Sequence, residues 1–156
     1  MSSPDANKEF SRAKNIIFRL LKIRNRSERE IRDRLKLKNI SKETIERTVL
    51  FCKTERLMDD RQFTQEWISA RLAKPYGWRR IAYELVQKGI PPDLLNEELV
   101  SAKANYREDE IVFELAAQQA AKYKNIDQAK CKQRLFNYLA NRGFSFDSIQ
   151  NAIDKL

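Results

Sequence analysis

Apolar residues recur along this chain in one pattern that occurs three times, about fifty residues apart. Each copy has six apolar positions at matching intervals and a seventh position that holds Asn or Gly. The copies read Ile31, Leu35, Asn39, Ile40, Ile45, Val49 and Cys52; then Ile81, Leu85, Gly89, Ile90, Leu95, Leu99 and Ala102; then Leu135, Leu139, Gly143, Phe144, Ile149, Ile153 and Leu156. Short helical intervals inside a fixed long period are typical of repeat architectures. The pattern therefore predicts a tandem helical repeat.

The Asn or Gly position of each copy predicts the end of a helix. A residue just past a helix C-terminus often adopts the left-handed conformation, which Gly reaches without strain and for which Asn is the usual substitute. A second helix is expected to begin two residues later, because Ser is a good N-cap and Pro fits a first turn. The caps are Asn39, Gly89 and Gly143, and the new helices start at Ser41, Pro91 and Ser145.

A further helix is predicted before each of these pairs. Its apolar stripe occupies residues 10–21 in the first copy, 63–70 in the second and 111–121 in the third. Ser27 and Glu30 have the spacing of a capping box for the helix that follows the first stripe. Each unit is thus expected to contain three helices.

The predicted fold class is all-α, with three tandem three-helix repeats that form an elongated curved array. The predicted domains are residues 1–56, 57–106 and 107–156. Units of about fifty residues are near the lower size limit for a single apolar core, so stacking between neighbours is expected to support them. A β fold is poorly supported, because the chain has only three Gly, four Pro and no hairpin signal.

The composition argues against an enzyme. The chain has no His, which is the commonest general base and metal ligand, and its two cysteines are not spaced as a zinc site. Cys52 continues an apolar helical face and is expected to be buried, whereas Cys131 near a helix start is either structural or a reactive thiol. The three glycines form no phosphate-binding loop. We expect no catalytic residue, no cofactor and no metal.

The hydropathy pattern bears on location. No apolar stretch approaches the length of a membrane span, and the first five residues lack the apolar core of a signal peptide. The mean hydropathy of −0.69 fits an elongated, well-solvated molecule. We therefore expect a cytoplasmic protein without membrane contact.

Positive charge is concentrated in the first unit. The formal net charge is +9, and between Arg12 and Lys38 eleven basic residues face three acidic ones. Such a patch is typical of a surface that binds a polyanion, most often nucleic acid, although a solvated Lys- and Arg-rich face is the alternative. The predicted first-unit contact set is Arg24, Arg26, Arg29 and Arg32.

A second basic cluster lies in the middle unit, where Pro75 interrupts the chain between two helices. Residues this close in sequence fan out around a helix, so some of them must face solvent or a partner. Aromatic residues beside Arg at a helix N-terminus suit a phosphate backbone or a protein hot spot. The predicted middle contact set is Arg71, Lys74, Tyr76, Trp78, Arg79 and Arg80. Packing of Tyr76 and Trp78 between units is the open alternative.

Segments of the first and middle units resemble signature sequences of the RecX family. The segment Leu57-Met58-Asp59-Asp60-x-x-Phe63, followed by Tyr76-Gly77-x-x-Arg80-Ile81-x-x-Glu84-Leu85-x-x-Lys88-Gly89-Ile90, is similar to the family's central signature, and Ser27-x-x-Glu30-Ile31-x-x-x-Leu35 is similar to its first unit. The third unit departs most, because Lys130-Cys131 stand where the middle unit has Tyr76-Gly77.

The resemblance implies a function in DNA repair, recombination and the SOS response. RecX-like proteins are non-enzymatic regulators of the RecA recombinase. They bind RecA filaments on DNA and limit filament growth, ATP hydrolysis and strand exchange. The implied partners are RecA as a nucleoprotein filament and DNA, single- or double-stranded, without sequence specificity. A monomer is expected.

Two other classes of function remain open. Tandem three-helix units also describe Myb-like DNA-binding proteins. Both tryptophans, however, lie in the middle unit, and each expected third helix has an acidic residue in its first turn, which would repel phosphate. The other alternative is a helical adaptor that binds only an acidic protein.

Overall fold

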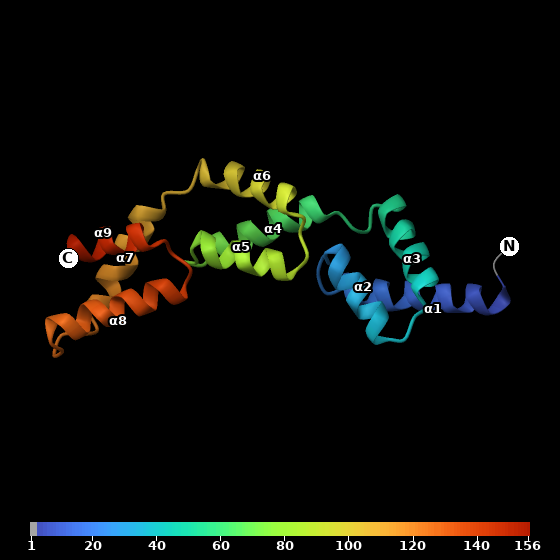
Figure 1. The fold of residues 1–156 in the computed structure, drawn as a ribbon, viewed down its shortest axis with the longest axis horizontal. Helices are drawn as coiled ribbons and strands as arrows, with labels where there is room; N and C mark the ends of the chain where they lie inside the picture. The colour runs from blue at the N-terminus through green and yellow to red at the C-terminus, as the bar shows by residue number, and fades with distance from the viewer. Residues whose placement is uncertain (1–2) are drawn as a thin grey trace.

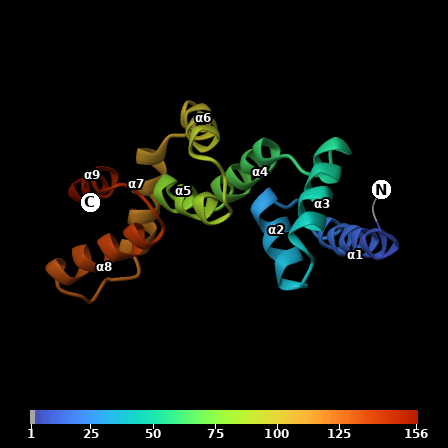
Figure 2. The ribbon, with the colours of Figure 1, turned by 45° about the vertical axis from the view of Figure 1, so that its right-hand side comes forward.

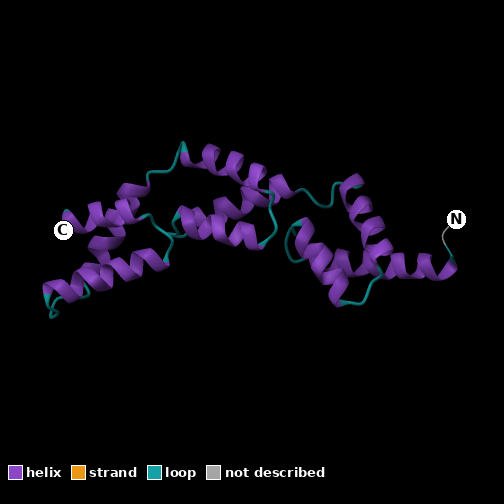
Figure 3. Cartoon of the chain, in the orientation of Figure 1, coloured by secondary structure: helices purple, strands orange, loops and turns teal. Residues whose placement is uncertain are grey.

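The computed structural model describes residues 3–156, and this part of the chain is helical with no β-strand (Figure 3). The helices are α1 (Pro4–Leu21), α2 (Glu28–Leu37), α3 (Lys42–Thr54), α4 (Asp60–Leu72), α5 (Trp78–Gln87), α6 (Pro92–Lys103), α7 (Glu108–Ala120), α8 (Gln128–Asn141) and α9 (Phe146–Asp154). The all-α prediction is confirmed.

The helices form three units that lie in a row, with the two ends of the chain at opposite ends of the molecule (Figure 1). Extensive helix packing occurs within α1–α3, within α4–α6 and within α7–α9, and each group encloses its own apolar core. The row stays extended and curved in a second view (Figure 2). The predicted array of three-helix repeats is therefore confirmed, while the boundaries at 56 and 106 stay a prediction.

The three predicted caps have the left-handed backbone that the sequence requires. The φ angles are 59° at Asn39, 77° at Gly89 and 89° at Gly143. The residue after each cap is buried, and its N–H donates to a carbonyl five residues earlier, as in Ile40 to Leu35 at 3.1 Å. This geometry closes the last helical turn and sends the chain directly into the next helix.

Side chains cap the starts of several helices, among them the predicted capping box of α2. The Ser27 hydroxyl accepts from the Glu30 N–H, and the Glu30 carboxylate accepts from the Ser27 N–H, so the capping box is complete. The Asp59 carboxylate accepts from the N–H groups of Arg61 and Gln62 at the start of α4. Cys52 is buried as predicted, and burial raises the pKa of its thiol to about 11.

The third unit has one extra helical turn. The α8 helix begins at Gln128, whereas the register of the repeat places its N-cap at Cys131, the counterpart of the N-caps Ser27 and Gly77. Cys131 therefore lies inside α8, half-buried against the third core. The N-terminus of α8 consequently differs from the N-termini of α2 and α5.

The second and third units meet where the start of α5 packs on the end of α8. The Gly77 N–H donates to the Arg142 carbonyl at 2.8 Å, and the Arg79 N–H donates to the Gly143 carbonyl at 3.1 Å. A Cβ atom on Gly143 would overlap the backbone and Cβ of Arg80. The free N–H groups of one helix thus satisfy the free carbonyls of another.

The first and second units meet in the same head-to-tail way, with different chemistry. The Ser27 hydroxyl donates to the Lys88 carbonyl at 2.7 Å, and the Lys88 ammonium lies 2.8 Å from the Glu30 carboxylate. The Glu28 N–H donates to Asp60 at 2.9 Å. Helices α8, α5 and α2 therefore follow one another through the centre of the molecule, each starting where the previous one ends (Figure 1).

Candidate partner-binding surface

The net charge of the protein resides almost entirely in one unit. Residues 1–56 contain sixteen Lys and Arg against eight Asp and Glu. Residues 57–106 contain seven of each, and residues 107–156 contain eight against seven. A polyanion would therefore be attracted to the α1–α3 end, and the middle unit has no net charge with which to attract one.

In the middle unit, Glu84 neutralises much of the predicted contact set. Its carboxylate accepts from Arg71 Nε at 2.7 Å, from Arg80 Nε at 3.2 Å and from Trp67 Nε1 at 2.9 Å. The Glu84 side chain is only 16% exposed, whereas Arg71 and Arg80 are 27% and 40% exposed, so the shielded part of the network is the central carboxylate. Arg71 and Arg80 therefore act first as structural partners of α5.

The Tyr76 ring is surrounded by three guanidinium groups. Arg80 lies 4.2 Å from the ring centroid, Arg71 lies at 5.4 Å, and Arg142 of the third unit lies at 5.8 Å. Arg142 also donates to the Pro75 carbonyl at 3.2 Å. Tyr76 is half-buried and belongs to the joint between the second and third units.

Trp78 lies in the core of the middle unit. It is 8% exposed and packs edge-on against Tyr106, with 4.7 Å between the ring centroids. The packing interpretation of Trp78 is thus the one that the geometry favours. Lys74 and Arg79 are the exposed members of the middle contact set, and no ion pair between their side chains and another described residue occurs.

Two of the four predicted arginines in the first unit are held in ion pairs. Arg24 contacts Glu30 at 2.6 Å, and Arg32 contacts Glu28 at 2.9 Å and Glu46 at 2.5 Å. Burial raises the pKa of Glu30, but hydrogen bonds from Arg24, Lys88 and the Ser27 N–H outweigh it and lower that pKa to about 2. The pairs of Arg24 and Arg32 lie within the first unit, and the contact of Lys88 with Glu30 joins the first unit to the second.

The other two arginines of that set are placed differently. Arg26 is half-buried, and within residues 3–156 its Nε is shielded from water without a hydrogen-bond acceptor; burial and the nearby Arg24 lower its pKa. Arg29 is exposed, yet its side-chain stem packs over Gly89, where a Cβ would meet it. The Arg29 guanidinium is therefore exposed to solvent, while its aliphatic carbons pack in the joint between the first and second units.

Trp67 joins the two predicted contact sets. Its ring centroid lies 5.9 Å from the Arg24 guanidinium of the first unit. Within its own unit it lies 5.1 Å from the Lys88 ammonium and 4.9 Å from the Arg71 guanidinium. Sequence reasoning missed this role and that of Glu84. The four-residue spacing of Arg80 and Glu84 was the available signal, since such pairs meet on a helix.

Candidate metal sites and membrane-spanning helices do not occur in the part of the chain that the structure describes. Over residues 3–156, no group of three or more His, Cys, Asp or Glu side chains is arranged to hold a metal ion. No helix within the same residues is long and apolar enough to cross a membrane.

Comparison with protein families matches all three units. Residues 13–52 match the first three-helix domain of RecX, residues 59–99 match the second, and residues 107–153 match the third. The chain belongs to the RecX family. The first of the two signatures that suggested this resemblance includes the capping box of α2. The second includes Tyr76 in the joint between the second and third units and Lys88 in the joint between the first and second units.

Individual RecX relatives agree over most of the chain. The regulatory protein RecX of Prosthecochloris aestuarii is 35% identical, covering 100% of this chain and 98% of that protein. The regulatory protein RecX of Clostridium perfringens is 30% identical, covering 95% of this chain and 70% of that protein. The crystal structure of RecX from Lactobacillus salivarius matches with a TM-score of 0.80 at 21% identity, covering 96% of this chain and 97% of the other.

Proposed function

We propose that this protein is a non-enzymatic regulator of RecA that binds RecA filaments on DNA and limits filament growth, ATP hydrolysis and strand exchange. The observation that carries the proposal is the match of all three units to RecX domains. The proteins that resemble it over nearly their whole length are named regulatory proteins. We further propose that it acts as a monomer in the cytoplasm.

The shape of the molecule supports a filament as the partner. Three units in a row, joined by short turns, present successive surfaces along one axis (Figure 1). A rigid row of weak contacts to successive protomers binds more tightly than any single contact, because each later contact forms at a high effective concentration. A filament offers such repeated surfaces, whereas a single globular partner does not.

The proposed contact residues follow from exposure and pairing. In the middle unit we assign direct contact with the filament to Lys74 and Arg79. Tyr76 and Arg80 stabilise the surface on which these two residues lie. In the first unit we assign direct contact to Arg29. Arg24, Arg32 and Arg71 support the surface through their ion pairs, and Trp78 supports it from the core.

The test is RecA's single-stranded-DNA-dependent ATP hydrolysis, titrated with this protein. We expect inhibition at well below one molecule per RecA, at a salt concentration where naked DNA is hardly bound. The double variant Lys74→Ala and Arg79→Ala should require a higher concentration for the same inhibition, with an unchanged melting temperature. A control variant, Lys122→Ala and Lys124→Ala, removes the same charge from the exposed surface of the third unit.

The opposite results have clear meanings. Unchanged hydrolysis together with tight DNA binding would support a stand-alone DNA-binding protein instead. Equal inhibition by the double variant and the wild type would remove Lys74 and Arg79 from the contact surface.

A further inference from the structure

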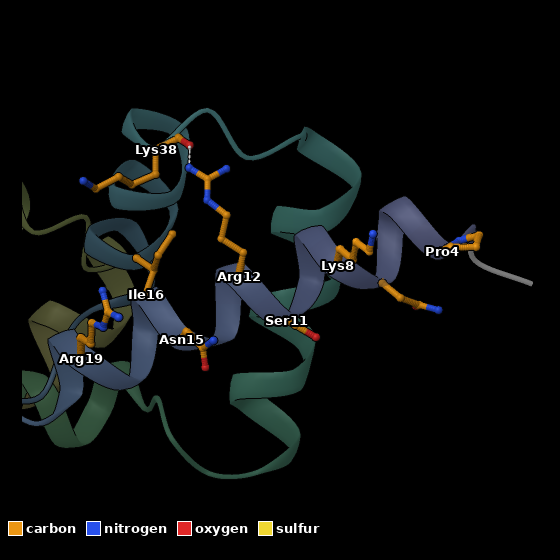
Figure 4. Close-up of a pocket in the computed structure, with 9 residues that line it drawn as sticks. Pro4, Lys8, Ser11, Arg12, Asn15, Ile16, Arg19 and Lys38 are labelled. Carbon is orange, nitrogen blue, oxygen red and sulfur yellow. Dashed lines mark hydrogen bonds between the residues drawn. The ribbon is translucent and has the colours of Figure 1, made fainter.

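A groove runs along α1, beside the end of α2 (Figure 4). It has a volume of about 700 Å³ and is lined by nine residues. Four of these are cations: Lys8, Arg12 and Arg19 from α1, and Lys38 from the cap of α2. The remaining lining residues are neutral, and three of them, Asn7, Ser11 and Asn15, carry hydrogen-bonding side chains.

The absence of carboxylates distinguishes this groove. Four other hollows on the described surface are each lined by at least two Asp or Glu residues. On α1 itself, Glu9 is engaged elsewhere, since its carboxylate accepts from the Ser41 N–H at 2.8 Å. The groove therefore combines four positive charges with no lining group that would repel an anion.

The cations of the groove are available to a ligand. All four residues are exposed, and over the described residues Lys8, Arg19 and Lys38 have no ion-pair partner. Arg12 reaches across the groove and donates to the Lys38 carbonyl at 3.0 Å, and over the described residues its guanidinium forms no ion pair with a carboxylate (Figure 4). This contrasts with Arg24, Arg32, Arg71 and Arg80, which pair with glutamates.

We propose that the α1 groove binds the phosphodiester backbone of a nucleic-acid strand without reading its sequence. Arg19 lies eleven positions after Lys8, which corresponds to about 16 Å along the helix, enough for contacts with several phosphates. Lysine and arginine bind phosphate oxygens directly, and amide and hydroxyl side chains add hydrogen bonds. The groove displays no exposed aromatic ring on which a base would stack.

This inference deepens the proposed function, because it rests on the DNA part of that proposal and assigns it to residues outside the predicted contact sets. It also assigns different partners to the first and second units. The α1 groove holds the nucleic-acid strand, while Lys74 and Arg79 of the neutral middle unit contact protein.

The test uses the full chain and a triple variant, Lys8→Gln, Arg19→Gln and Lys38→Gln. Arg12 is left in place because it caps α2. The matched control is Lys122→Gln, Lys124→Gln and Lys130→Gln, which removes three exposed charges from the third unit. Binding to a labelled thymidine oligonucleotide, and to a duplex of the same length, is measured by fluorescence anisotropy over a range of salt concentrations.

The groove variant should bind at least about tenfold more weakly at low salt. Its plot of log affinity against log salt should be shallower by about 2 for the single strand and about 3 for the duplex, if three phosphate contacts are lost. The nucleic acid, single strand or duplex, whose binding affinity falls by the larger factor in the groove variant is the preferred ligand of the groove. Equal losses in the groove and control variants would overturn the inference.

RecA ATP hydrolysis, measured with the same variants, separates this inference from the proposed function. Normal DNA binding by the groove variant, with intact inhibition of RecA by the wild type, would overturn the groove alone. Weakened DNA binding by the groove variant, with no effect of the wild type on RecA, would overturn the proposed function and leave the groove in place.

Discussion

At the scale of single residues, two partly buried glutamates decide which cations are available to a partner. Glu30 engages Arg24 and Lys88, and Glu84 engages Arg71 and Arg80. The basic segments of the sequence therefore contain two kinds of cation. Those that face a glutamate stabilise the fold, whereas those on the outer face of α1 and at Lys74 and Arg79 remain open to solvent.

Glu30 should make the stability of the protein sensitive to acid. Because its folded-state pKa is about 2 and its ordinary value is 4.5, its ion pairs stabilise the fold fully above about pH 4.5. The contribution is lost as the pH falls from 4.5 towards 2. Glu30→Gln should lower the free energy of unfolding by about 2 kcal/mol at pH 7.

Urea unfolding at pH 7 and at pH 3 measures this effect. The difference between the wild type and Glu30→Gln should shrink at the lower pH. Glu43→Gln, at an exposed position of α3, is the control and should change stability little. A difference that is constant with pH would show that Glu30 does not act through its charge.

At this scale the sequence predicts a residue's role correctly where its side chain or its φ angle affects backbone groups a few residues away. The capping box of Ser27 and Glu30 and the left-handed caps were predicted because their partners lie within a few residues. The ion pairs of Glu30 with Lys88 and of Arg71 with Glu84 were not predicted, because they join residues 58 and 13 positions apart. Such pairs depend on how the helices pack, which local spacing does not determine.

At the scale of helices, the joint between α5 and α8 depends on a small residue at one position. Gly143 has a φ of 89°, and its Cα lies directly against the start of α5. The sequence predicted the left-handed conformation but not this close approach. The same glycine therefore ends one helix and allows another to dock on it.

Gly143→Ala should weaken both the cap and the joint. A left-handed alanine costs about 1 kcal/mol or more, and the overlap with Arg80 adds to this cost because the obstructing atoms include backbone. We expect a loss of at least about 2 kcal/mol in the free energy of unfolding. Hydrogen exchange should also speed up at the N–H groups of Gly77 and Arg79. Unchanged exchange at these two amides would contradict the described joint.

Asn39→Gly at the matching cap of the first unit should have the opposite effect. Asn39 adopts a φ of 59°, and it is exposed, with no neighbouring unit packed on it. Glycine removes the strain of this conformation, so we expect a gain of about 0.5 kcal/mol in the free energy of unfolding. Thermal unfolding measures it, and a lower melting temperature for Asn39→Gly would contradict this account.

At the scale of the whole molecule, the two joints differ in what holds them. The joint between the first and second units combines the Lys88–Glu30 ion pair with hydrogen bonds that involve the side chains of Ser27 and Asp60. The joint between the second and third units uses backbone hydrogen bonds at Gly77 and Gly143. Ion pairs near the surface weaken with salt, and backbone hydrogen bonds are less affected. The sequence predicted three units in a row but gave no sign of this difference.

Lys88→Met should loosen only the first of these joints. Methionine keeps much of the side-chain volume and removes the contact with Glu30. Single-molecule energy transfer between dyes on α3 and α6 should broaden in this variant, and in the wild type at high salt. Dyes on α6 and α9 serve as the control and should report an unchanged distribution. Equal broadening of both pairs would show that the joints are not distinct.

The end-to-end order of α8, α5 and α2 has a consequence for the field that the backbone produces. Each helix carries about half a positive charge at its start and half a negative charge at its end, and at both joints these partial charges cancel. The negative half-charge that remains lies at the end of α2, within the most basic unit and beside the α1 groove. The Arg12 guanidinium covers the Lys38 carbonyl at that point. An anion in the groove would therefore depend on Arg12 twice, once for its own charge and once because it shields the anion from a helix end that would repel it.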